Sequence, residues 1–304
     1  MTYVNKNLNK GSNQMTSLQK KDFLTNQSYV IYDSDTMPFK NQTISHFALS
    51  DSLTTFIGKR QHKAAIHFWS TNQLVIIGMM DTKLPHLSDG LAVLTANQQA
   101  YIVRNSGGLA VASDPGILNF SLIFSEELTN RITIDEGYDF MFRLVSETFK
   151  EYSKPIEAYE ISDSYCPGDF DLSINGKKIA GIAQRRIKNG VAIMIYLSVT
   201  GDQNKRAQLL QDFYTAGLQD EQVKWHFPKI NPAVMGTLEE LLGVKLTVQN
   251  VKEKIIQTLQ ERHCTFEIGE YTPEILSLYE ESKQKMIDRN LQMLKESVQK
   301  ELLI

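Results

Sequence analysis

The sequence has few cysteines, no long apolar run and no long run of positive charge. Only two cysteines, Cys166 and Cys264, occur in 304 residues, and neither forms part of a paired CxxC spacing. So few cysteines fit a reducing compartment better than an oxidising one, although a disulfide between them stays open. No stretch is apolar enough to span a bilayer or to form a signal peptide. We therefore expect a cytoplasmic protein.

Charge and composition exclude further classes. The formal net charge is −3 and no basic block occurs, which argues against nucleic acid as a main partner. The six histidines show no ligand spacing such as HxxxH, so no metal site is expected. Hydrophobic residues make up 42% and charged residues 22%, an ordinary balance for a globular protein with a core.

Composition divides the chain into three parts. Residues 1–28 are polar and rich in Asn, Gln and Lys, so we expect a flexible tail. Residues 29–235 hold the β-prone runs and are predicted to form the main domain. Residues 236–304 show helical patterns, and we predict a helical C-terminal extension packed on that domain.

Local patterns predict the elements. Helical spacing of apolar residues predicts helices over 43–57 and 135–152, and from residue 205 onward, including 248–262 and 272–303. Thr237 and Glu240 are spaced as in a capping box. β-Prone runs predict strands over 64–68, 74–77, 101–104 and 117–124, with 109–112 continuing strand 101–104 beyond a glycine pair.

Two Asn-Gly pairs give the clearest local prediction. Asn175-Gly176 and Asn189-Gly190 each separate possible strands, and Asn-Gly favours tight hairpins because both positions need positive φ. We therefore predict a three-stranded antiparallel meander over 171–174, 178–184 and 191–199. Small residues within its central strand suggest that something approaches the backbone closely; they are Ala180, Gly181 and Ala183.

Three features could carry chemistry. In the segment Arg104–Gly108, two glycines would let backbone N–H groups approach a ligand or an oxyanion, although a plain turn is the alternative. Cys166 precedes Pro167, which favours an extended conformation in an exposed loop. Its thiol needs a positive neighbour or N–H donors to become a good nucleophile.

Lys178 is the candidate neighbour, in phase with Ala180, Ile182 and Gln184 of the same predicted strand. A partly desolvated lysine can exchange a proton with a thiol, and the alternative is a solvated hairpin lysine. The remaining groups have plain interpretations: Asp169 and Asp171 as solvated turn carboxylates, and Cys264 as a small buried hydrophobe.

Taken in order, these segments resemble motifs of the lipoate–protein ligase and octanoyltransferase family. Arg104–Gly108, with Asp114 and 118–121 after it, resembles Arg-Arg-x-Ser-Gly-Gly-Gly and Asn-Leu-Asn-Phe-Ser. Asp171-Leu172, followed by residues 175–181 and Gln184-Arg185, resembles the family's Asn-Gly-Lys-Lys-Ile-Ala-Gly-x-Ala-Gln motif. Residues 166–171 look like the cysteine loop of the branch that takes octanoyl groups from the glycine cleavage H protein. The resemblance covers roughly residues 60 to 200, and its ordered motifs are more specific than any one of them.

The resemblance implies an α+β fold related to biotin ligases and class II aminoacyl-tRNA synthetases: a mainly antiparallel sheet flanked by helices, with 29–235 as the catalytic domain. It implies that Cys166 carries the acyl group as a thioester and that Lys178 orients the acyl carbonyl and handles the proton. The substrate-binding residues that it implies are Arg104, Ser106, Gly107, Gly108, Asn119, Ala180 and Gly181.

The implied reaction moves an octanoyl or lipoyl group from a lysine of glycine cleavage H protein to lipoyl domains of 2-oxoacid dehydrogenase complexes, without a cofactor. Val103, Leu109 and Ser113 depart from the ligase motif, which weakens the case for an ATP site. Three alternatives stay open: an ATP-dependent lipoate–protein ligase, a transferase that takes octanoyl from acyl carrier protein, and an inactive module that binds lipoyl domains.

Overall fold

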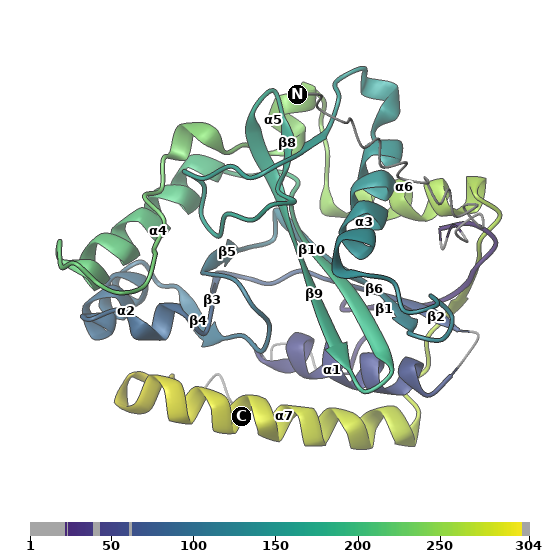
Figure 1. Ribbon diagram of the computed structural model, residues 1–304, viewed down its shortest axis with the longest axis horizontal. Coiled ribbons are helices and arrows are strands. Elements are labelled where there is room, and N and C mark those ends of the chain that lie inside the picture. The colour runs from purple at the N-terminus through teal and green to yellow at the C-terminus, as the bar shows by residue number, and fades with distance from the viewer. Residues whose placement is uncertain (1–21, 23, 39–42, 61–62, 300–304) are drawn as a thin grey trace, which may run out of the picture.

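An eight-stranded mixed sheet forms the centre of the molecule (Figure 1). The computed structural model describes residue 22 and residues 24–38, 43–60 and 63–299. The strand order is β11-β1-β2-β6-β10-β9-β8-β7, with β11, β1 and β2 parallel and every other neighbouring pair antiparallel. The strands are β1 (Ser28–Asp33), β2 (Ala64–Trp69), β6 (Ile117–Ser125), β7 (Glu157–Ala158), β8 (Leu172–Ile174), β9 (Lys177–Ile187), β10 (Gly190–Ser198) and β11 (Thr265–Ile268). The predicted mainly antiparallel sheet is confirmed.

A second sheet has three strands in the order β4-β3-β5: β3 (Leu74–Ile77), β4 (Ala100–Val103) and β5 (Val111–Ser113). The prediction that 109–112 continues strand 101–104 is wrong, because β3 lies between β4 and β5. β3 and β4 are parallel, and parallel neighbours need a crossover, which α2 (Leu87–Ala96) supplies.

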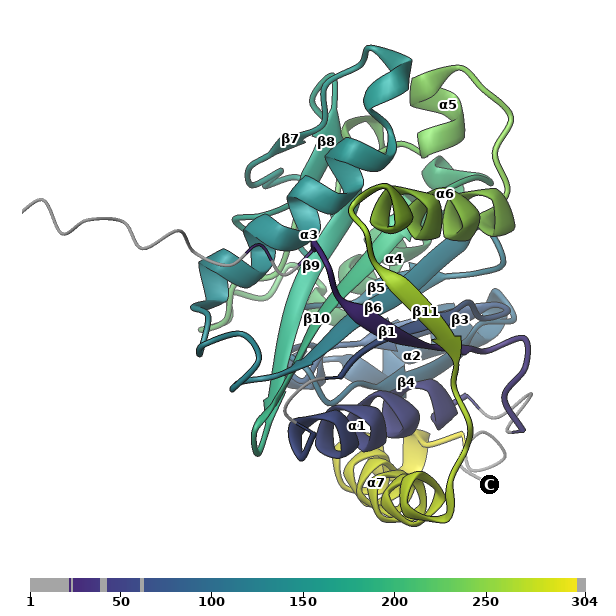
Figure 2. The same ribbon diagram turned by 90° about the vertical axis from the view of Figure 1, so that its right-hand side faces the viewer.

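Helices cover both sheets (Figures 1 and 2). The helices are α1 (Ser45–Gly58), α3 (Ile134–Thr148), α4 (Gln203–Leu218), α5 (Leu238–Leu242), α6 (Val248–Glu261) and α7 (Pro273–Leu294), with short 3-10 turns η1 (Asp81–Lys83), η2 (Lys150–Tyr152), η3 (Pro232–Val234) and η4 (Lys295–Ser297). α3, α5 and α6 share one core with the large sheet, whereas α1 and α7 pack together beyond its other face. Thr237 accepts a hydrogen bond from the Glu240 N–H, as the start of α5 requires.

The predicted meander is present as β8, β9 and β10. Asn175 and Gly176 have φ of 52° and 74°, the positive values that their hairpin turn needs. The second turn is displaced by one residue from the prediction: Gly190 already pairs with Ile187, so the turn is formed by 188–189.

A β-bulge in β9 changes which side chains face the site. Leu172 pairs with Ala180 and Ser173 with Lys178, so Ile179 is an extra residue on β9. Ile179 and Ala180 both enter the core. The predicted phase of Lys178 with Ala180 is therefore wrong, because the extra residue places Lys178 on the same face as Gly181.

The ends of the described chain are tied into the body. Leu24 is fully buried, so the last part of the predicted flexible tail belongs to the core, whereas residues 1–21 and 23 lie outside the described range. The predicted C-terminal extension contributes β11 as well as helices, and its residues 300–304 lie outside that range.

α7 also covers an edge of the small sheet. The amide of Asn290 accepts from Val103 N at 2.8 Å and donates to Val103 O at 3.2 Å, so it pairs with the edge strand β4 as a neighbouring strand would. No helix in the described part of the chain is both long and apolar enough to cross a membrane.

Candidate active site

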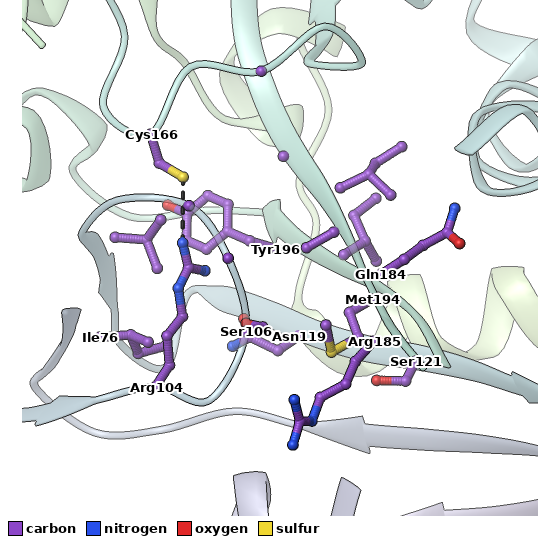
Figure 3. Close-up of a pocket in the computed structure, with 18 of the residues that line it drawn as sticks. Ile76, Arg104, Ser106, Asn119, Ser121, Cys166, Gln184, Arg185, Met194 and Tyr196 are labelled. Carbon is purple, nitrogen blue, oxygen red and sulfur yellow. Dashed lines mark hydrogen bonds between the residues drawn. The ribbon is translucent and has the colours of Figure 1, made fainter. Parts of the chain in front are cut away.

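A cavity of about 310 Å³ lies between the face of the large sheet and two loops. One loop is Arg104–Gly108 after β4, and the other is 165–168 before β8. In Figure 3, Cys166 and Arg104 lie at one end of this cavity, and Ser121, Met194 and Gln184 lie toward the other. Eight of the nine predicted site residues line it: Arg104, Ser106, Gly107, Gly108, Asn119, Cys166, Lys178 and Gly181.

The ninth, Ala180, does not line the cavity. Its side chain is fully buried in the core between the large sheet and α3, on the opposite face of β9. The bulge explains this correction, because the extra residue Ile179 shifts the alternation that the sequence pattern implies.

Sheet register builds the floor of the cavity. Asn119 on β6 pairs with Tyr196 on β10, which pairs with Gly181 on β9. A second row across the same strands consists of Ser121, Met194 and Ala183. Directly opposed residues of antiparallel strands share a face, so both rows point into the cavity. The small side chains on β9 leave room there for a ligand.

The sulfur of Cys166 is held by two donors. Sγ accepts from Leu109 N at 3.2 Å and from Arg104 Nη2 at 3.4 Å, a contact drawn in Figure 3. N–H donors and a guanidinium at this distance stabilise negative charge on sulfur. Cys166 is half-buried and lines the cavity.

The backbone at Cys166 differs from the prediction. Its φ is +46°, in the left-handed region that few residues other than glycine adopt, whereas Pro167 predicted an extended conformation. The carbonyl of Cys166 accepts from Lys178 Nζ at 2.8 Å while Sγ is held from the other side. These contacts outweigh the local preference.

Gly108 allows the loop to close on the sulfur. Its φ is +97°, and a Cβ at this position would lie 2.2 Å from Arg104 Nη2 and 2.9 Å from Cys166 Sγ. At Gly107, by contrast, an added Cβ would meet nothing within 4 Å. Only one glycine of the pair is therefore required by the close approach.

Lys178 is buried and holds the cysteine loop. Nζ donates to Ser164 Oγ at 3.1 Å, Tyr165 O at 3.0 Å and Cys166 O at 2.8 Å, and it pairs with Asp171 Oδ1 at 2.8 Å. All four polar partners described for Nζ are oxygen atoms, and none of them is the sulfur of Cys166. Lys178 and Cys166 thus share one cavity, and the lysine fixes the backbone that carries the sulfur.

Asp171 is not the solvated carboxylate that the sequence suggested. It is 1% exposed and accepts from Ile161 N and Gly168 N in addition to its pair with Lys178. Burial raises the pKa of Asp171, and the ammonium of Lys178 acts in the opposite direction without cancelling the effect.

Two further groups at the site were not identified from the sequence. Arg185 forms a bidentate pair with Asp51 of α1 and donates to Asn105 O at 2.7 Å, which ties the Arg104–Gly108 loop to a helix. The hydroxyls of Tyr165 and Tyr196 are hydrogen-bonded at the cavity wall. The Gln184-Arg185 pair at the end of a motif was the available signal for Arg185.

The remaining predicted residues are the polar lining. Asn119 donates to Ser113 Oγ at 3.2 Å, and Ser106 is a buried residue of the same lining. Within the described part of the chain, no three His, Cys, Asp or Glu side chains are grouped to hold a metal ion. The arrangement places a thiol that accepts from two donors at one end of a partly apolar pocket.

Comparison with known proteins assigns the class. Residues 43–260 match the lipoyl protein ligase A/B catalytic domain, and the chain belongs to this family. Its fold is similar to a lipoate protein ligase of Thermoplasma acidophilum with bound lipoic acid, with a TM-score of 0.64, 19% identity and coverage of 86% of this chain and 96% of that one. It is also similar to lipoate-protein ligase A bound with ATP, with a TM-score of 0.63, 18% identity and coverage of 84% and 94%.

Particular relatives are closer in sequence. The chain is 42% identical to "Octanoyl-[GcvH]:protein N-octanoyltransferase" of Macrococcus caseolyticus over 249 residues, 82% of this chain and 90% of that protein. It is 38% identical to "Lipoyl-[GcvH]:protein N-lipoyltransferase" of Listeria monocytogenes over 262 residues, 86% of this chain and 94% of that protein.

Proposed function

We propose that this chain is an acyltransferase that moves an octanoyl group from a lysine of glycine cleavage H protein (GcvH) to a lysine of a lipoyl domain, through a thioester on Cys166. The proposal of a thioester rests on one observation: two donors meet at Sγ of Cys166, which lines the cavity. The names of the relatives from M. caseolyticus and L. monocytogenes support GcvH as the donor. We place the reaction in the cytoplasm, with lipoyl domains of 2-oxoacid dehydrogenase complexes as acceptors.

The proposed reaction has two half-steps. The Cys166 thiolate attacks the carbonyl carbon of the octanoyl amide, the C–N bond breaks, and the donor lysine leaves as an amine after taking up a proton. A lysine amine of the acceptor then attacks the thioester carbonyl, loses a proton and releases the thiolate. One amide is exchanged for another, so the scheme needs no ATP.

The lining residues have separate roles in this scheme. Arg104 and Leu109 N stabilise the thiolate before the first half-step and after the second, and the Gly107–Gly108 backbone supplies N–H groups near the developing oxyanion. Lys178 handles the proton in this scheme, while its bonds to the loop oxygens keep Cys166 in place. The acyl chain lies along the sheet, against the two rows of lining residues that begin with Asn119 and Ser121.

The test is transfer from octanoyl-GcvH to a lipoyl domain without ATP, with wild type, Cys166→Ala and Cys264→Ala. We expect transfer by wild type and by Cys264→Ala, and a hydroxylamine-labile octanoyl adduct on Cys166 by mass spectrometry. Full transfer by Cys166→Ala from free lipoate plus ATP would instead identify a ligase. If octanoyl-acyl carrier protein were the only effective donor, the proposed donor would be wrong.

A further inference from the structure

One peptide group lies behind both donors of Cys166. The carbonyl of Leu109 accepts from Arg104 Nη2 at 2.7 Å, and the N–H on the other side of the same peptide bond, that of Ala110, donates to Tyr214 Oη at 3.1 Å. The peptide unit is planar, so these two bonds fix its orientation. Arg104 Nη2 is bonded directly to this unit, and Leu109 N lies in the preceding peptide unit, joined to it through the Leu109 Cα.

Asp81 fixes the hydroxyl that holds this peptide group. The Tyr214 hydroxyl donates to Asp81 Oδ1 at 2.8 Å, and Asp81 Oδ2 accepts from Gly78 N at 2.8 Å. Because its hydrogen points to the carboxylate, the hydroxyl oxygen presents its lone pairs to Ala110 N. Asp81 is fully buried and Tyr214 is 2% exposed, so water does not compete for either bond.

Gly78 also supports the loop from below. A Cβ there would lie 2.0 Å from Gly108 O, so the chain before η1 is in close contact with the Arg104–Gly108 loop. The carboxylate of Asp81 therefore holds Gly78, which contacts the Arg104–Gly108 loop. Through Tyr214 of α4 it also holds Ala110, just after that loop. A buried carboxylate with only neutral hydrogen-bond partners is costly to maintain.

We infer that Asp81 and Tyr214 are positioning residues for Cys166: they hold the 109–110 peptide group so that Leu109 N and Arg104 Nη2 meet at the sulfur. Neither residue lines the cavity, and the hydrogen bonds described for Cys166 Sγ come from Arg104 and Leu109, so Asp81 and Tyr214 act through the loop. This inference deepens the proposed function, because it names what makes the proposed nucleophile reactive.

The test begins with a measurement that needs no substrate. In Tyr214→Phe, Ala110 N loses its acceptor, and we expect iodoacetamide to alkylate Cys166 several-fold more slowly than in wild type at pH 7.5, followed by mass spectrometry of the peptide that contains Cys166. Tyr279→Phe is the matched control, since Tyr279 is a buried tyrosine of α7 whose hydroxyl bonds Ser45 Oγ at 2.9 Å, away from the loop. We expect Tyr279→Phe to react like wild type.

Transfer kinetics then distinguish positioning from plain stability. We expect Tyr214→Phe to lower kcat for octanoyl transfer about tenfold while leaving KM for the donor unchanged. Asp81→Asn keeps one acceptor oxygen but directs its new N–H group at one of the two donors, the Tyr214 hydroxyl or Gly78 N. We therefore expect it to slow alkylation and to lower kcat less than Tyr214→Phe does. It also serves as the second variant if Tyr214→Phe folds poorly, which thermal melting would show.

The outcomes separate the two proposals. Alkylation of Cys166 at the wild-type rate in folded Tyr214→Phe and Asp81→Asn would overturn the positioning role. A lower melting temperature with unchanged alkylation and kcat would overturn it as well. If wild type failed to transfer octanoyl groups but the variants still slowed alkylation, the positioning role would stand and the proposed function would fall.

Discussion

The two cysteines differ in the direction of the hydrogen bonds at their sulfur atoms. Sγ of Cys166 accepts hydrogen bonds from a guanidinium and a backbone N–H at the edge of a cavity. Sγ of Cys264 donates to Leu24 O at 3.3 Å, and burial raises the pKa of its thiol. The difference shows that the donors around a thiol, rather than the residue type, mark a candidate nucleophile.

The largest expected effect comes from substituting Cys166, which tests the difference between the two cysteines directly. Cys166→Ala removes the proposed nucleophile, so octanoyl transfer should fall by about a thousandfold or more, because no other group supplies the covalent step. Cys264→Ala should keep transfer within about twofold and lose only roughly 1 kcal/mol of stability from a small buried group. Initial rates with octanoyl-GcvH and urea unfolding measure the two quantities, and equal transfer by both variants would refute the distinction.

Two lysines that are buried in the described part of the chain sharpen the comparison. Lys178 bonds backbone oxygens of the cysteine loop as well as Asp171, whereas the polar contacts described for Lys252 are with the carboxylates of Asp33 and Asp35. Lys178→Ala leaves Asp171 buried and unpaired, so we expect a loss of roughly 3–5 kcal/mol by urea unfolding. Lys252→Ala should cost less, because Asp33 is partly exposed, and should leave the rate of Cys166 alkylation unchanged.

A pH series tests the carboxylate behind the loop. Burial raises the pKa of Asp81 to about 6, against the opposing effects of Tyr214, Gly78 and Arg104. The folded protein therefore binds this proton more tightly than the unfolded chain, and stability is lost as pH rises from about 4 to above 6. The difference corresponds to about 3 kcal/mol. The free energy of unfolding of wild type relative to Asp81→Asn should fall by this amount, and a constant difference would contradict the assignment.

The adjacent glycines give the smallest and most local comparison. Gly108→Ala forces a Cβ against Arg104 Nη2 and Cys166 Sγ at a positive φ, so transfer should fall roughly 10- to 100-fold as the loop moves. Gly107→Ala meets no neighbour and should stay within about twofold of wild type. If both variants lost activity equally, the loss would come from loop flexibility instead of the close approach at the sulfur.

The sequence predicted the parts of the fold that depend on local chemistry. The meander followed from Asn175-Gly176, whose positive φ values the turn needs, and most strands of the two sheets followed from β-prone runs. The position of β3 between β4 and β5 depends on long-range pairing that no local pattern encodes. β1 and β11 likewise pair across most of the chain length.

The candidate site divides in the same way. The order of the motifs predicted that Arg104, Cys166 and Lys178 belong to one site, and all three line the same cavity. The bulge at Ile179 could not be foreseen, because alternation along a strand assumes an unbroken ladder, and it removed Ala180 from the lining. Asp171 looked like a turn residue because no local pattern shows that Ile161, Gly168 and Lys178 fold around its carboxylate. Asp81 and Tyr214 lie outside the motifs and act through a backbone amide.

The amide of Asn290 has a practical consequence for handling the protein. By satisfying both backbone groups of Val103, it occupies an edge at which a strand from another molecule would otherwise add. Shortening the chain before α7 would uncover that edge together with the apolar side chains beneath the helix. Such a fragment should self-associate as its concentration rises, so fusion partners are better placed after the last helix than in exchange for it.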